Sequence, residues 1–109
     1  MKAVTLGRTL QFGEPHADET ALADLCRRYH VRELSLFGST ARGETNSTSD
    51  IDLLVDFLPG ANIDLVDYAG LMLDLSKLFL RKVDLVAKSG LKPVIRASVL
   101  ADARLLYAA

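Results

Sequence analysis

Apolar residues recur at two spacings along the chain, and the changes between them predict its elements. A spacing of three and four residues indicates an amphipathic helix, whereas alternation or a short apolar run bounded by glycine or proline indicates a strand. The predicted elements are, in chain order, a helix over 18–30, strands over 31–37 and 49–57, a helix over 64–80, a strand over 82–88, a helix over 93–102 and an apolar end at 105–107 that is a candidate last strand. This order predicts an α/β or α+β fold in which helices pack on a small mixed sheet.

The segment before the first helix is open to two interpretations. Apolar residues alternate on either side of Gly7, which is typical of a short hairpin, but the same pattern fits a loosely attached terminal arm. We therefore expect residues 1–17 to form an arm or hairpin and residues 18–109 to form a single domain.

The predicted helix over 64–80 is apolar around most of its circumference. Its polar residues, among them Asp67, Asp74 and Lys77, trace one narrow stripe. A helix with so little polar surface has to be covered on more than one side. Packing between the sheet and another helix would cover it, and docking of part of its surface onto a partner chain is the alternative.

Composition narrows the class of protein. With 109 residues, half of them hydrophobic and a quarter charged, the chain is expected to fold rather than to be disordered. Lys and Arg number 13 against 14 acids, for a net charge of −1, which argues against strong nucleic-acid binding. No apolar run approaches the roughly 20 residues of a membrane helix, and the N-terminus lacks a secretion signal. We expect a cytoplasmic protein that does not contact membranes.

Cys26 is the one cysteine of the sequence, so an intrachain disulfide and a metal site built from several cysteines are excluded. Its position on the apolar stripe of the first helix favours a buried structural side chain over a reactive thiol. His16 and His30 have no second ligand at a spacing typical of a metal site.

Gly38 and Ser39 stand where the strand over 31–37 gives way to a helical turn. A glycine there lets the backbone approach a ligand closely, and the free N–H groups of a starting helix suit a phosphate. An ordinary helix start with Ser39 as its N-cap explains the same two residues.

Asp50 and Asp52 lie two residues apart in an apolar strand, which places both carboxylates on one face, with their Cα atoms about 6.5–7 Å apart. Their mutual repulsion, and the rise in pKa that burial would add, are relieved by a divalent cation such as Mg²⁺. A solvent-facing edge is the alternative, and the apolar neighbours of the two acids argue against it.

Asp84 is either a plain surface acid or, if its strand lies beside the strand over 49–57, a third ligand. Three carboxylates could hold two metal ions that clamp the oxygens of a phosphoryl displacement.

Taken together, these residues resemble a known family. The string GSTARGETNSTSDIDLLVDF, which begins at Gly38, has a GS pair, ten further residues and a DxD motif, and a DLV strand follows at Asp84. This order is similar to the minimal nucleotidyltransferases of the DNA polymerase beta superfamily, over most of the chain from Leu22 to Tyr107. The resemblance implies a palm-like nucleotidyltransferase core.

The resemblance also implies roles for individual residues. Gly38 and Ser39 would hold the triphosphate of the nucleotide. Arg42 would add positive charge to the phosphates, unless it is a solvated helix arginine.

For the acids, the resemblance implies that Asp50 and Asp52 bind two Mg²⁺ ions. Asp84 would bind one of them and orient or deprotonate the acceptor hydroxyl. The reaction would be an in-line attack on the α-phosphate of a nucleotide, with ATP and AMP transfer as the expectation, and with release of pyrophosphate.

The acceptor is expected to come from a partner protein, since few residues follow the third acidic strand. Proteins of this group resemble the antitoxin half of HEPN/MNT toxin–antitoxin pairs, in which AMP is transferred to a tyrosine of the HEPN toxin. A non-catalytic antitoxin that neutralises its partner by contact is the alternative. The sequence leaves the acceptor, the base preference and any homo-oligomer open.

Overall fold

The computed structural model describes residues 17–43 and 50–109. Its elements are, in order, α1 (Glu19–Arg28), β1 (Val31–Leu36), α2 (Gly38–Ala41), β2 (Ile51–Phe57), α3 (Leu65–Phe79), β3 (Val83–Ala87), a short 3₁₀ helix η1 (Lys88–Gly90), α4 (Pro93–Asp102) and β4 (Arg104–Ala108). The predicted helices and strands agree with these bounds within a few residues, and the candidate last strand is present as β4. The arm or hairpin predicted over residues 1–17 lies outside the described residues, Ala17 apart.

Local hydrogen bonding explains where the longer helices begin. The Asp18 carboxylate accepts the backbone N–H of Ala21 at 2.9 Å, as expected of an N-cap. At the start of α3, Asp64 and Asp67 form a capping box. Pro93 lies in the first turn of α4, where its missing backbone N–H costs no hydrogen bond, because N–H groups of the first turn have no partner within the helix. The polar residues that mark these boundaries in the sequence therefore act as caps.

Four strands of the described chain form one sheet, in the spatial order β3-β2-β1-β4. β1 pairs antiparallel with both β2 and β4, whereas β2 and β3 run parallel. A parallel pair needs a crossover connection, and α3 lies in the segment that joins β2 to β3. The mixed sheet with helices packed on it confirms the predicted fold class.

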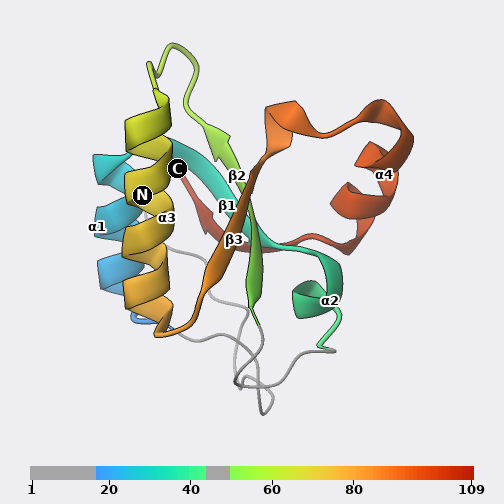
Figure 1. Cartoon of the computed structure of the whole chain (residues 1–109), viewed down its shortest axis with the longest axis horizontal. Coiled ribbons are helices and arrows are strands. Elements are labelled where there is room, and N and C mark those ends of the chain that lie inside the picture. Colours follow the sequence, from blue (N-terminus) through green and yellow to red (C-terminus); the bar gives the residue numbers. More distant parts are fainter. Residues whose placement is uncertain (1–16, 44–49) are drawn as a thin grey trace.

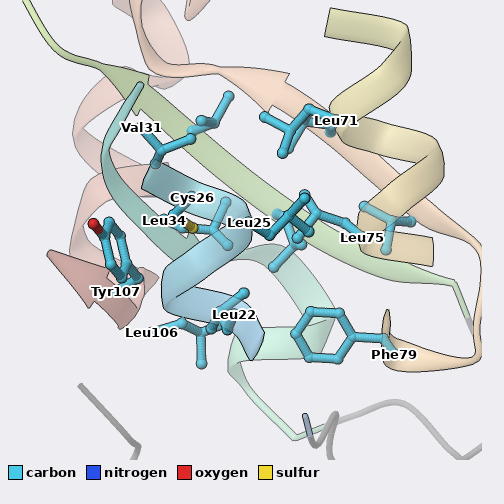
Figure 2. Packing of buried hydrophobic residues seen from close by; sticks show 14 of the residues in the cluster. Leu22, Leu25, Cys26, Val31, Leu34, Leu71, Leu75, Phe79, Leu106 and Tyr107 are labelled. Atoms are coloured by element: carbon cyan, nitrogen blue, oxygen red, sulfur yellow. The ribbon is translucent and has the colours of Figure 1, made fainter. Parts of the chain in front are cut away.

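The helices lie on two sides of the sheet. α1 and α3 lie side by side against one face, while α2 and α4 lie on the other side (Figure 1). Figure 2 shows the core between α1, α3 and the sheet, to which these residues contribute: Leu22, Leu25 and Cys26 of α1, Leu71, Leu75 and Phe79 of α3, Val31 and Leu34 of β1, and Leu106 and Tyr107 of β4.

At the start of β2, buried and part-exposed residues alternate, which shows which side chains point to each face of the sheet. Ile51, Leu53 and Val55 are buried in the core under α1 and α3. Because strand side chains alternate, Asp52 and Asp56 project from the opposite face, which we call the outer face of the sheet.

Cys26 is fully buried in the core, and burial raises the pKa of its thiol to about 12. A thiol with so high a pKa carries almost no thiolate near neutral pH. The prediction of a structural cysteine is confirmed.

Only part of α3 is covered by the rest of the domain. Leu71, Leu75 and Phe79 are buried, whereas Leu73 and Leu80 are 60% and 88% exposed. Packing inside the domain, as predicted, therefore accounts for one side of this helix and leaves another apolar side open. Across the described residues, no helix combines the length and hydropathy needed to cross a membrane.

Candidate active site

The parallel pair of β2 and β3 brings two acidic residues together. Asp52 and Asp84 are direct Cα partners in the register of these strands, and neighbouring strands lie about 4.8 Å apart. The adjacent residues Ile51 and Val83 are buried in the core, so both carboxylates lie on the outer face. The strand adjacency on which a role for Asp84 depends is therefore present.

Asp50 and Lys82 stand immediately before β2 and β3, respectively. The backbone N–H of Ile51 donates to the Lys82 carbonyl oxygen at 2.9 Å, which joins the starts of the two strands. The Lys82 ammonium lies 3.9 Å from a carboxylate oxygen of Asp50, whose side chain is 52% exposed. Asp50 thus lies just before β2, next to the Asp52–Asp84 pair, and the Lys82 ammonium lies beside it.

A second pair of acids lies across neighbouring strands of the same sheet, and each of its members has a cation. Glu33 and Asp56 are Cα partners on β1 and β2. The Lys88 ammonium lies 3.8 Å from Glu33, and the Arg32 guanidinium lies 3.8 Å from Asp56. These two carboxylates are neutralised by the protein itself.

Neither Asp52 nor Asp84 forms an ion pair with any residue in 17–43 or 50–109. Burial raises the pKa of the Asp52 carboxyl, and the charge of Asp84 raises it further. A hydrogen bond from Thr40 lowers this pKa in part, and the charge of Asp50 raises it again. The ionised form of Asp52 is therefore disfavoured in the fold, and a bound cation would relieve this.

Thr40 fixes the position of Asp52, and the sequence reasoning missed it. Its side chain is fully buried. Its hydroxyl accepts the backbone N–H of Asp52 at 3.0 Å and donates to a carboxylate oxygen of the same residue at 3.4 Å. The only signal in the sequence is that Thr40 follows the GS pair directly, because the contact with Asp52 arises from tertiary packing.

Gly38 brings the backbone close to the same carboxylate. Its φ of +63° is left-handed, which glycine adopts without strain. A Cβ at this position would stand 3.2 Å from an Asp52 carboxylate oxygen. The backbone N–H of Phe37 also donates to the Asp52 carbonyl oxygen at 3.1 Å. The turn into α2 is therefore packed directly onto Asp52.

The donor set of this site suits a hard cation. Within the part of the chain that the structure describes, no three acids, histidines or cysteines converge as a ready-made metal cage. Mg²⁺ commonly takes one or two carboxylates and completes its shell with water and substrate phosphates, and the Asp52–Asp84 pair fits that pattern. The assignment of Asp50, Asp52 and Asp84 as metal ligands stays a prediction.

The order of these features along the chain is also the order of a known domain. A glycine turn into a short helix precedes an acidic strand, and a second acidic strand pairs with the first. The sequence model of the nucleotidyltransferase domain matches residues 19–106. The chain belongs to the nucleotidyltransferase domain family. This nucleotidyltransferase is therefore an enzyme, as the sequence resemblance implied.

Similar proteins agree with this assignment. The protein adenylyltransferase MntA of Thermococcus cleftensis is 42% identical over 83 residues, which cover 72% of this nucleotidyltransferase and 78% of MntA. A solved structure of a candidate minimal nucleotidyltransferase has a TM-score of 0.65 and 43% identity, covering 77% of this chain and 84% of that one. A chain of a solved toxin–antitoxin structure with AMP-PNP shares the fold, with a TM-score of 0.66, 24% identity and coverage of 83% and 73%.

For two predicted phosphate-binding residues of the nucleotidyltransferase, Ser39 and Arg42, the structure differs from the alternative interpretation of the sequence. Ser39 is not the N-cap of α2, because the helix starts at Gly38 and Phe37 takes the cap position; the Ser39 side chain lies outside what the structure describes. Arg42 is not simply solvated, since its guanidinium lies 3.1 Å from the Asp102 carboxylate at the end of α4. A role of either residue toward phosphates stays a prediction.

A hollow of about 190 Å³ lies on the outer face of the nucleotidyltransferase, between the sheet and α4. Its lining includes Leu54, two residues along β2 from Asp52, together with Asp56 and Lys88. A larger hollow of about 650 Å³, around Leu58 and Ile63, lies beyond the other end of β2. The smaller hollow is therefore the one on the side of the acids.

Proposed function

We propose that this nucleotidyltransferase transfers AMP from ATP to a hydroxyl group of a partner protein, in a Mg²⁺-dependent reaction that releases pyrophosphate. The observation that carries the proposal is the pairing in register of Asp52 and Asp84, beside the Gly38 turn and without a neutralising side chain among the described residues. The name of the relative that is 42% identical, a protein adenylyltransferase, supports both AMP and a protein acceptor.

Each residue of the site has a separate task in this reaction. Bound Mg²⁺ would supply positive charge that neutralises the triphosphate and polarises the α-phosphate. Asp52 and Asp50 would hold the ions, and Thr40 keeps the Asp52 carboxylate in place. Gly38 leaves room for the triphosphate to lie against the backbone of the turn.

Asp84 would handle the proton of the acceptor. Its side chain is exposed and stands in register with Asp52, so an incoming hydroxyl can reach it. The carboxylate takes the hydroxyl proton while the hydroxyl oxygen bonds to the α-phosphorus. The bond from the α-phosphorus to the bridging oxygen breaks, pyrophosphate leaves, and AMP remains on the acceptor.

The partner that we propose is a HEPN-type toxin, with this chain as the cytoplasmic antitoxin. The sequence resemblance implies this class of partner, and a toxin–antitoxin structure contains a chain of the same fold. Modification of the toxin would then be the event that neutralises it.

The experiment measures transfer of label from α-³²P-ATP to a purified HEPN-type partner. Asp52→Asn and Asp84→Asn are expected to lower transfer on the order of 100-fold or more, since each removes a charge that acts on the reacting groups. Asp56→Asn is the matched control, because Asp56 lies on the same strand and face but is paired with Arg32. Transfer by Asp52→Asn at the wild-type rate would show that the proposed chemistry is wrong.

Neutralisation by contact alone gives a different result in cells. In a toxicity assay, Asp52→Asn is expected to fail to protect against the toxin although it still binds it. Protection equal to that of the wild type would assign the antitoxin effect to binding instead of AMP transfer.

A further inference from the structure

The outer side of α3 carries an apolar stripe that the described residues leave open. Val66, Leu73 and Leu80 stand seven residues apart, so they follow one line along the helix surface. They are 79%, 60% and 88% exposed, and Leu65 beside them is 81% exposed. We call Val66, Leu73 and Leu80 the outer stripe.

The neighbouring helix in the same layer has a different outer surface. The exposed residues of α1 are all polar: Glu19, Thr20, Asp24, Arg27 and Arg28. The apolar surface is therefore specific to α3 and is not a general property of the layer.

Leu80 combines exposure with backbone strain. It is the C-cap of α3 and has a φ of 57°, in the left-handed region that glycine usually occupies at helix ends. Inside the domain its side chain gains almost no burial in return. A strained residue with an exposed apolar side chain is explained if a second chain covers it.

We propose that the outer stripe is the contact between two copies of this chain, which pair with their α3 helices antiparallel across a two-fold axis at Leu73. On this axis Leu73 meets Leu73 of the second copy. Val66 then meets Leu80 of the second copy, because each is seven residues from the axis. Every residue of the outer stripe faces an apolar residue in this arrangement.

The charges at the ends of α3 favour the antiparallel orientation. The N-terminal end carries Asp64 and Asp67, whereas the last turn carries Lys77 and is followed by Arg81 and Lys82. An antiparallel pair places the acidic end of one helix beside the basic end of the other and opposes the two helix dipoles. A parallel pair would place like charges together.

The position of α3 argues against the acceptor protein as the occupant. α3 covers the face of the sheet opposite the outer face, on which Asp52 and Asp84 lie (Figure 1). A substrate seated on the outer stripe would hold its hydroxyl group away from these acids. A second copy leaves both acidic sites open, so this inference does not depend on the proposed function.

The test uses the two-fold axis, where any charge introduced at Leu73 faces its own copy. The full-length chain is measured by sedimentation equilibrium from micromolar to several hundred micromolar. We expect a dimer for the wild type, monomers for Leu73→Glu and Leu73→Lys alone, and recovery of the dimer when these two variants are mixed in equal amounts. Val94→Glu, at an apolar residue of α4 that is 86% exposed, is the control and should stay dimeric.

Recovery in the mixture also shows that both variants fold, because misfolded chains would not pair. A monomeric wild type, a dimeric Leu73→Glu variant, or a mixture that stays monomeric would each overturn the proposal. Protection of the outer stripe from hydrogen exchange that appears only when a HEPN-type partner is added would assign the surface to that partner and also overturn it.

Discussion

Removal of the Asp52 charge is expected to stabilise the fold while it destroys the site. The carboxylate is part-buried beside Asp84, and no cation of the described chain offsets the repulsion between them. The Asp52→Asn side chain has nearly the same shape and can still accept the hydrogen bond from Thr40. The charge is thus the main property that changes.

The magnitude follows from the spacing of the strands. Two charges about 5 Å apart repel by about 1 kcal/mol at the dielectric constant of water and by about 3 kcal/mol at an effective value of about 20. Asp84 is exposed, so solvent screening favours the lower figure. A gain of about 1 kcal/mol corresponds to a rise in Tm of about 4 °C for a chain of this length.

The pH dependence has a definite sign. Burial and the charge of Asp84 raise the pKa of the Asp52 carboxyl above its ordinary value of 3.8, so folding disfavours the ionised form. Below pH 3.8 the carboxyl is protonated in both the folded and the unfolded chain, and Asp52→Asn gains nothing. As the pH rises through the raised pKa the wild type loses stability relative to the variant, so the full gain is present at neutral pH.

The assay is thermal unfolding followed by circular dichroism at several pH values, with divalent cations removed by EDTA. Asp56→Asn again serves as the control, because it removes an attraction to Arg32 instead of a repulsion. Its Tm should stay equal to that of the wild type or fall slightly. A Tm of Asp52→Asn at or below the wild-type value at neutral pH would refute the electrostatic reasoning.

Three further predictions concern ligand binding at the site and the space around two glycines. Mg²⁺ with ATP should raise the Tm of the wild type and leave that of Asp84→Asn nearly unchanged, because binding to the folded acidic site is what stabilises it; an equal shift in both would contradict the site. Gly38→Ala should abolish AMP transfer, since its Cβ would lie 3.2 Å from the Asp52 carboxylate in a strained backbone, and a fully active variant would contradict this placement. Gly70→Ala gains up to about 1 kcal/mol of helix propensity, but its Cβ would stand 2.9 Å from the Tyr29 hydroxyl and push that side chain away from its hydrogen bond to Asp74. We expect the free energy of unfolding, measured by urea titration, to fall by about 1 kcal/mol, with Ala69→Ser as a control that should change little, and a more stable Gly70→Ala variant would contradict this contact.

The elements themselves could be predicted because local signals agree with one another. Asp18, Asp64 and Pro93 mark helix starts that the structure realises as caps or first-turn residues. The period-two pattern around Asp52 places its face correctly, because the apolar residues beside it have only one core to enter. These features depend on neighbours within a few residues, which a sequence displays directly.

Contacts between distant residues could not be predicted in the same way. The ion pair between Arg42 and Asp102 joins residues sixty positions apart, and the hydroxyl of Thr40 reaches Asp52 twelve positions away. The residue type alone does not predict a contact with a distant residue, because threonine and arginine are also common on exposed turns. Likewise, the exposure of Leu73 depends on how far the sheet and α1 extend around α3, and no pattern along the helix encodes that extent.

The sheet register distinguishes the acid that we propose as functional from an acid that is paired within the fold. Asp52 and Asp56 lie four residues apart on one strand and one face, so periodicity treats them alike. Their neighbours differ: the parallel strand places a second carboxylate beside Asp52, whereas Asp56 has the Arg32 guanidinium 3.8 Å away. A chain selected only for stability would neutralise both positions, since an unpaired acid pair costs free energy of folding. Among the described residues, Asp52 is the acid of this strand without a cation, which supports the proposal that its charge is used outside the fold to hold a metal ion with its nucleotide.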